Sequence, residues 1–180
     1  MKSVGIIEVI CGPMFAGKTE ELIRLATRLD YAKKQYLVLK PSLDTRYADT
    51  EIVSHSNYRK NSISITNSKE IYDHVTDSID VVIVDEVQFF DNNIIDICED
   101  LANKGIRVIV GGLDCDYKGN PFQITSELLA RAEKVTKLTS ICSVCGDPAT
   151  KSKRLSENDQ LIVLGSGKEY EPRCRKCHTL

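Results

Sequence analysis

Residues 12–19 have the types and spacing of a phosphate-binding loop. They read Gly-x-x-x-x-Gly-Lys-Thr, and the two glycines would let successive backbone N–H groups point at a chain of phosphates. Lys18 would reach the β and γ phosphates, and Thr19 would hold Mg²⁺ through its hydroxyl. An apolar run before the motif and a helical pattern after it supply the strand–loop–helix context that a P-loop needs. The predicted ATP- and phosphate-binding residues are Gly12, Pro13, Met14, Phe15, Ala16, Gly17, Lys18 and Thr19.

An acidic pair, Asp85-Glu86, directly follows the apolar run Val81 to Val84. Because open α/β sheets bind ligands at the carboxyl ends of their strands, Asp85 is predicted to hold Mg²⁺ together with Thr19, directly or through water. Glu86 could accept the proton of the group that attacks the γ-phosphate. The pair alone leaves open whether that group is water, as in an ATPase, or a substrate hydroxyl, as in a kinase. A structural carboxylate is the third interpretation.

Four of the seven cysteines form two Cys-x-x-Cys pairs that are separated by 28 residues. Two such knuckles supply four thiolates in the tetrahedral arrangement that Zn²⁺ prefers, with no open position for chemistry. The predicted ligands of a structural zinc are Cys142, Cys145, Cys174 and Cys177. His178 could substitute for one of them, and four buried free thiols are the alternative. The other three cysteines are interpreted as packing residues.

The stretch Ser42 to Asn61 is polar and has no period, and a loop of that length in a compact domain is usually functional. Its Arg46 could clamp phosphates or stabilise the charge being transferred, although a solvated surface loop fits the spacing equally well. The excursion between the cysteine pairs could close over the site and exclude water. The aromatic residues that could stack on a base, or simply fill the core, are Phe89, Phe90, Tyr117, Phe122 and Tyr170.

The composition favours a small-molecule substrate over nucleic acid. Of the 180 residues, 42% are hydrophobic and 28% charged, which is ordinary for a globular protein. The net charge of −2 and the isoelectric point near 6.0 differ from the basic stripe usual in nucleic-acid-binding proteins. No apolar run approaches the roughly 20 residues of a membrane span. The odd cysteine count and the lack of a signal peptide favour a reducing, cytoplasmic location.

Strand and helix patterns alternate along most of the chain, which predicts an α/β fold with a parallel sheet flanked by helices. Strands are predicted over 4–10, 36–40, 62–66, 81–84, 107–110 and 134–138. Helices are predicted over 20–34, 69–75, 94–102 and 124–132. We expect a P-loop nucleotide-binding domain over residues 1–138 and a small zinc-binding domain over 139–180, with a short strand at 161–164.

Several motifs taken together resemble the type II, cytosolic thymidine kinases of bacteria, animals and some large DNA viruses, nearly end to end. Besides the P-loop these are Lys40-Pro41 with Asp44-Thr45-Arg46-Tyr47, Asp85-Glu86-Val87-Gln88-Phe89-Phe90, Leu113-Asp114, Lys118-x-x-Pro121-Phe122, Lys153-Arg154-Leu155 and Gly165-x-Gly167-x-x-Tyr170. The resemblance implies a RecA-like P-loop domain, a zinc-bearing lasso domain, and transfer of the ATP γ-phosphate to the 5′-hydroxyl of thymidine for nucleotide salvage, with Mg²⁺. It also implies a cytoplasmic homotetramer inhibited by thymidine triphosphate. The charge and the lack of a long apolar run predict no nucleic-acid or membrane partner.

The same resemblance assigns roles residue by residue. Glu86 matches the general base, and Arg46 matches a basic residue near the transferred phosphate. The residues that match the thymidine site are Met14, Asp44, Phe89, Leu113, Tyr117, Phe122, Ser152, Leu161, Val163 and Tyr170. Val87 and Ser152 depart from the small residue and the threonine that some relatives have there, which leaves pocket size and substrate range less defined.

Two other functions fit the P-loop, the acidic pair and the thiolates without the resemblance. One is a zinc-ribbon ATPase that acts on nucleic acid, although the mildly acidic isoelectric point opposes it. The other is a nucleotide-sensing switch that binds ATP and hydrolyses almost none. Thymidine-dependent release of ADP would separate both from a kinase.

Overall fold

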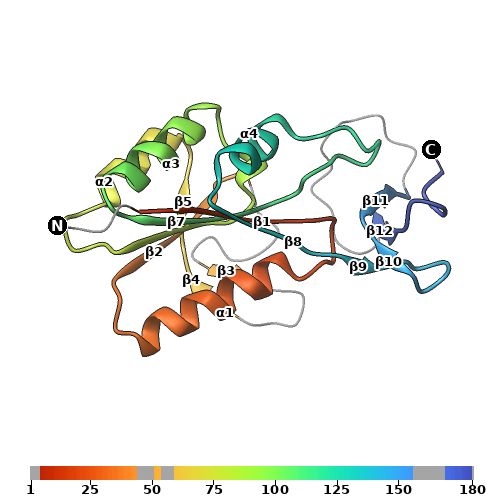
Figure 1. Cartoon of the computed structure of the whole chain (residues 1–180), viewed down its shortest axis with the longest axis horizontal. Helices are drawn as coiled ribbons and strands as arrows, with labels where there is room; N and C mark the ends of the chain where they lie inside the picture. The colour runs from red at the N-terminus through yellow and green to blue at the C-terminus, as the bar shows by residue number, and fades with distance from the viewer. Residues whose placement is uncertain (1–4, 44–50, 54–58, 156–168, 180) are drawn as a thin grey trace.

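A six-stranded parallel sheet forms the centre of the protein (Figure 1). The computed structural model describes residues 5–43, 51–53, 59–155 and 169–179. The strands of this sheet are β1 (Ile7–Cys11), β2 (Tyr36–Pro41), β5 (Ile63–Ile65), β6 (Val81–Val84), β7 (Arg107–Gly112) and β8 (Lys134–Lys137). They lie in the order β5-β2-β6-β7-β1-β8, and every neighbouring pair is parallel. The predicted α/β class is therefore confirmed.

Helices cover both faces of the sheet, as Figure 1 shows. They are α1 (Lys18–Tyr31), α2 (Ile71–His74), α3 (Asn93–Asn103) and α4 (Gln123–Arg131), with 3₁₀ turns η1 (Ser68–Glu70) and η2 (Val87–Phe89). Helix α1 lies on one face, and α2, α3 and α4 lie on the other. Among the described residues no helix combines the length and the apolar character that crossing a membrane requires.

The side chains of the buried strands alternate between two hydrophobic clusters. In β6, Val82 and Val84 belong to the cluster beneath α3 and α4, whereas Val81 and Ile83 belong to the cluster beneath α1. This two-residue period follows from the pleat of a strand, which points successive side chains to opposite faces. Because both faces are covered, these strands appear in the sequence as continuous apolar runs.

Two local expectations were wrong. Helix α1 ends at Tyr31 and does not reach Lys34, because Lys33 has a left-handed backbone (φ 54°) that terminates the helix. The stretch predicted to be a featureless loop contains an antiparallel hairpin of β3 (Glu51–Val53) and β4 (Arg59–Asn61). Its Ile52 is buried in the α1 cluster, so tertiary packing stabilises strands that are too short to produce a visible period.

A small lobe of short strands forms the carboxyl-terminal part of the chain, at the right of Figure 1. Strand β9 (Ser140–Ile141) pairs with β10 (Pro148–Ala149), and β11 (Lys151–Arg154) pairs with β12 (Tyr170–Arg173). The strand predicted at 161–164 lies outside the described residues. The division at residue 138 stays a prediction.

Candidate active site and metal centre

The P-loop follows β1 and curls because several of its residues have positive φ angles: Gly12 (148°), Phe15 (63°) and Gly17 (82°). Gly12 must be glycine for a steric reason as well, because a Cβ there would lie 2.5 Å from the carbonyl oxygen of Leu138. Gly17 is the N-cap of α1, and its carbonyl accepts the first helical hydrogen bond from the N–H of Glu21 at 3.0 Å. The loop is therefore shaped to aim backbone N–H groups and a helix N-terminus at an anion.

The side chain of Lys18 is buried and folds back over this loop. Its Nζ donates a hydrogen bond to the carbonyl oxygen of Pro13 at 2.8 Å. This hydrogen bond offsets part of the cost of burying the ammonium group. The position agrees with the role predicted for Lys18, which stays a prediction.

Thr19 and Asp85 meet between the start of α1 and the end of β6. The Thr19 hydroxyl donates to Asp85 Oδ2 at 3.0 Å. Two adjacent oxygen ligands of an octahedral Mg²⁺, at about 2.05 Å from the ion, lie about 2.9 Å apart, so this pair fits two neighbouring positions of a magnesium shell. Burial raises the pKa of Asp85 to about 7, and the negative charge of Glu86 adds to the effect. A cation bound there would favour the ionised carboxylate.

Glu86 has a left-handed backbone with φ 51°, and its own N–H donates to Asp85 Oδ1 at 2.9 Å. Its side-chain Oε2 accepts a hydrogen bond of 2.6 Å from Nε2 of Gln88. Oε1 of Gln88 in turn accepts the N–H of Leu113 at 2.9 Å. Because β6, β7 and β1 are neighbours in the sheet, the acidic pair, Leu113 and the P-loop lie along one sheet edge.

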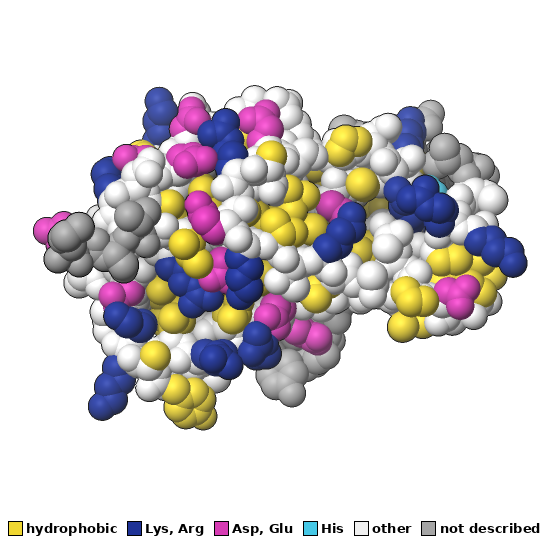
Figure 2. Space-filling view, viewed as in Figure 1, with side chains coloured by type: hydrophobic (Ala, Val, Ile, Leu, Met, Phe, Trp, Pro, Cys, Tyr) yellow, Lys and Arg dark blue, Asp and Glu magenta, His cyan; other side chains and the backbone are white. Residues whose placement is uncertain are grey.

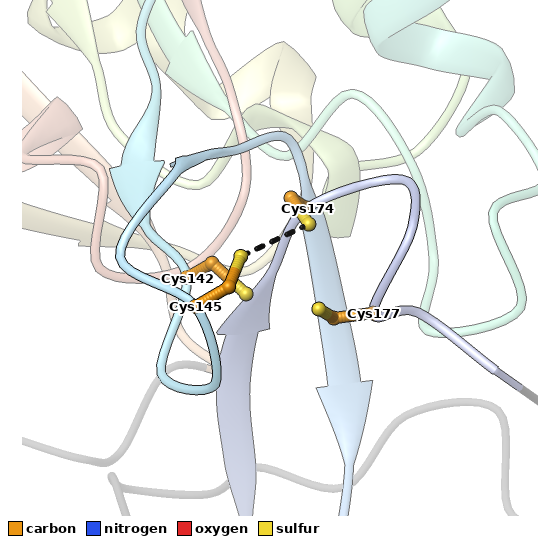
Figure 3. Close-up of side chains that lie close together, drawn as sticks. All are labelled: Cys142, Cys145, Cys174 and Cys177. Atoms are coloured by element: carbon orange, nitrogen blue, oxygen red, sulfur yellow. Dashed lines mark hydrogen bonds between the residues drawn. The ribbon is translucent and has the colours of Figure 1, made fainter.

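The four predicted zinc ligands converge in the small lobe, as Figure 3 shows. Their sulfur atoms all lie within 4.8 Å of one another, and Cys145 Sγ is 3.6 Å from Cys174 Sγ. A tetrahedral Zn²⁺ with Zn–S bonds of about 2.3 Å requires S···S distances of about 3.8 Å, so the thiolates fit the ion. Burial would raise the pKa of Cys142, but backbone N–H groups of Cys174, Cys145 and Val144 outweigh it and lower the pKa to about 6.

The imidazole of His178 contacts a different segment, since its Nε2 is 2.9 Å from the carbonyl oxygen of Tyr117. The sequence left this histidine open as a substitute ligand. Within the described residues the cluster that could hold a metal ion consists of cysteines alone. Figure 2 shows basic and acidic side chains interspersed on the face drawn there, in agreement with the small net charge.

A comparison with models of protein families identifies the family of the chain. The model described as Thymidine kinase matches residues 5–178. The chain belongs to the thymidine kinase family. Among solved structures it is similar to the Pif1 helicase from Candida albicans, at 12% identity and a TM-score of 0.43. That similarity covers 75% of this chain and 36% of the helicase chain, so this chain spans about a third of the helicase's length.

The residues predicted to form the thymidine site come from both lobes. The backbone N–H of Met14, in the P-loop, donates to the hydroxyl of Ser152 on β11 at 2.9 Å. Tyr117, after β7, lies under the guanidinium of Arg154, whose carbon is 3.9 Å from the ring centre. Nη2 of Arg154 also donates to the hydroxyl of Tyr170 at 2.6 Å. Thus Met14 meets Ser152, and Tyr117 meets Tyr170 through Arg154, across the two lobes.

Two further residues predicted for this site, Phe89 and Phe122, lie in the sheet-bearing part of the chain. Phe89 lies on η2, three residues after Glu86, and the N–H of Phe122 donates to the carbonyl of Asp114 at 3.0 Å. Four predicted residues lie outside the described ones: Asp44, Arg46, Leu161 and Val163.

Two residues that organise this region, Gln88 and Arg154, have no role predicted from the sequence. Both are buried polar side chains, exposed by 8% and 7%. Both lie inside the motifs on which the family resemblance rests, and this position was the one indication in the sequence that they have a role. Their contacts reach residues 25 and 37 positions away, which no local pattern reveals.

Proposed function

We propose that this protein transfers the γ-phosphate of ATP to the 5′-hydroxyl of thymidine and forms thymidine monophosphate for nucleotide salvage. The observation that carries the proposal is that Glu86 stands beside the Thr19–Asp85 pair, at the end of the sheet from which the P-loop starts. Membership of the thymidine kinase family over residues 5–178 supports thymidine as the acceptor.

In the proposed reaction the P-loop N–H groups and Lys18 bind the phosphates of ATP. Glu86 accepts the proton of the 5′-hydroxyl while that oxygen attacks the γ-phosphorus. The bond from the γ-phosphorus to the β–γ bridging oxygen breaks, and ADP leaves with the electron pair. Arg46 would stabilise the charge on the transferred group. Mg²⁺, held by Thr19 and Asp85, would neutralise charge on the β and γ phosphates when bound.

Thymidine would lie between the two lobes. Side chains from the P-loop, η2 and the segment after β7 would wall its base, namely Met14, Phe89, Leu113, Tyr117 and Phe122. Ser152 and Tyr170 would approach it from the small lobe, with Asp44, Leu161 and Val163 as further contacts. The contacts of Ser152 with Met14 and of Arg154 with Tyr117 support this arrangement because they join the two lobes.

The four cysteines would hold a structural Zn²⁺ that joins the ends of the small lobe. The ion would supply folding energy, since a closed set of four thiolates leaves no position for substrate. We further propose a P-loop domain over residues 1–138, a lasso domain over 139–180, a cytoplasmic homotetramer, and inhibition by thymidine triphosphate.

An assay with labelled thymidine and ATP tests the proposal. We expect labelled thymidine monophosphate and ADP in equal amounts, both dependent on Mg²⁺. ATP turnover that is unchanged by thymidine but stimulated by DNA or RNA would instead identify a nucleic-acid ATPase. Tight ATP binding with almost no hydrolysis in a single-turnover experiment would identify a nucleotide switch.

A further inference from the structure

The geometry points to Gln88 as the positioning residue that orients Glu86 for proton transfer. The inference rests on the proposed function, because it names the side chain that aligns the base of that reaction. Gln88 would touch neither substrate and would act through Glu86. No role for it follows from the P-loop, the acidic pair or the thiolates.

The two hydrogen bonds of the Gln88 amide determine which way it faces. Its Oε1 accepts the N–H of Leu113 at 2.9 Å, and a backbone N–H can only donate. Its Nε2 must therefore face Glu86 Oε2, at 2.6 Å, as the donor. A carboxylate oxygen accepts such a hydrogen bond more strongly when it carries no proton. Gln88 thus stabilises Glu86 in the form that can accept a proton.

The bond also distinguishes the two oxygens of Glu86. A proton that arrived on Oε2 would weaken the short bond that this oxygen accepts, so the transferred proton is directed to Oε1. The same bond restrains rotation of the Glu86 carboxyl group. The side chain therefore loses this rotational entropy before the substrate binds, and not during the reaction. The role is therefore one of orientation rather than of substrate contact.

The surrounding structure is built to hold this amide. A Cβ at Gly112 would lie 2.7 Å from Gln88 Oε1 and 2.8 Å from Val87 Cγ1. The absence of a side chain at Gly112 therefore lets η2 pack directly against the end of β7. Gln88 is 8% exposed, so water competes little for either hydrogen bond.

Two variants separate the bond to Glu86 from the bond to Leu113. Gln88→Glu keeps an oxygen for the Leu113 N–H but, when ionised, offers no donor to Glu86, whereas Gln88→Met loses both bonds at similar volume. We expect both variants to lower kcat about 10- to 100-fold, with KM for ATP and thymidine within about threefold of the unaltered protein. The matched control is Gln123→Met, which removes an exposed amide–carboxylate bond of 3.1 Å to Glu127 on α4 and should leave kcat unchanged.

A double-mutant cycle provides the decisive measurement. If Gln88 acts through Glu86, adding Gln88→Met to Glu86→Gln should lower kcat by less than about twofold, because the base that Gln88 orients is already lost. Gln88→Met that costs the same factor in both backgrounds would overturn the inference and indicate a separate structural role. Exchanging the two residues, as Glu86→Gln with Gln88→Glu, re-forms an amide–carboxylate bond and should restore thermal stability but not kcat.

The outcomes distinguish the inference from the function on which it rests. An unaltered protein that forms no thymidine monophosphate contradicts the proposed function, and the inference about Gln88 with it. An active protein whose Gln88→Glu and Gln88→Met variants keep kcat within about threefold overturns the inference alone. Should Gln88→Met fail to fold, the isosteric Gln88→Glu still gives the result, since it retains the bond to Leu113.

Discussion

At the scale of single residues, the site depends on left-handed backbone conformations, which residues other than glycine rarely adopt. Glu86 has φ 51°, and a left-handed conformation costs a non-glycine residue about 1–2 kcal/mol. Its N–H bond to Asp85 and its side-chain bond to Gln88 stabilise that conformation. Strain of this kind persists where the surrounding structure determines it, and it is common at functional sites.

Glu86→Gln tests the proposed role of Glu86 as the base. The amide is nearly isosteric but accepts a proton poorly, so kcat should fall about 100-fold or more while ATP still binds. Turnover and ATP binding measured on one preparation check this, with the surface variant Glu99→Gln as the control. An equal loss of ATP binding would indicate that the carboxylate organises the site and takes no proton.

Gly12→Ala tests the shape of the P-loop. Alanine would be strained at φ 148°, and its Cβ would lie 2.5 Å from the carbonyl oxygen of Leu138. Because the obstacle is backbone, the loop must shift, and we expect affinity for ATP to fall at least about 10-fold. Gly146→Ala is the matched control, since it also has a positive φ but has no atom within 4 Å of its Cβ position. Unchanged ATP affinity in Gly12→Ala would contradict a phosphate-binding role for this loop.

At the scale of elements, Asp91 joins η1 to the start of α3. Its carboxylate accepts hydrogen bonds from the N–H and hydroxyl of Ser68 and from Asn93. Burial acts to raise the pKa of Asp91, but these hydrogen bonds outweigh burial and lower the pKa to about 2. One side chain thus holds two elements that are separated by β6 in the sequence.

The pH dependence follows from that lowered pKa. The unfolded chain binds the proton near the ordinary aspartate value, about 3.9, so Asp91 stabilises the fold above that pH. The contribution should disappear as the pH falls from about 4 to about 2. Asp91→Ala should therefore lower the free energy of unfolding by about 1–2 kcal/mol at pH 7 and flatten its change below pH 4. Urea titrations at several pH values measure this free energy. If it changed with pH below 4 as steeply in the variant as in the unaltered protein, the role of Asp91 would be contradicted.

At the scale of the whole molecule, the small lobe is joined to the nucleotide-binding sheet by a few polar contacts. Ser152 accepts the Met14 N–H, and His178 contacts the carbonyl oxygen of Tyr117. These contacts join β11 and the carboxyl-terminal segment to the P-loop and to the segment after β7. A change in the candidate metal centre should therefore alter the geometry of the predicted thymidine site.

Cys174→Ser tests this connection. The variant should lose most of its zinc, because only three strong thiolate ligands remain. We expect the apparent KM for thymidine to rise several-fold while ATP affinity changes little. Metal analysis together with initial rates checks both effects, and Cys115→Ser should retain the zinc. Full zinc content in Cys174→Ser would exclude this cysteine as a ligand.

The sequence by itself determined the chemistry that depends on local spacing. The P-loop, the Asp85-Glu86 pair and the two cysteine knuckles are short motifs, and the order of strands and helices follows from the period of apolar residues. The helix end at Tyr31 and the β3–β4 hairpin escaped prediction. One depends on the backbone angle of a single lysine, and the other on the burial of Ile52.

Only the tertiary structure decided how these groups meet. The strand order β5-β2-β6-β7-β1-β8 makes neighbours of segments that are far apart in the chain, and a list of strands does not contain that order. Gln88 reaches Leu113 because β6 lies beside β7, and Met14 reaches Ser152 across 138 positions. The physical reason is that side-chain hydrogen bonds act over about 3 Å in space, whatever the separation along the chain.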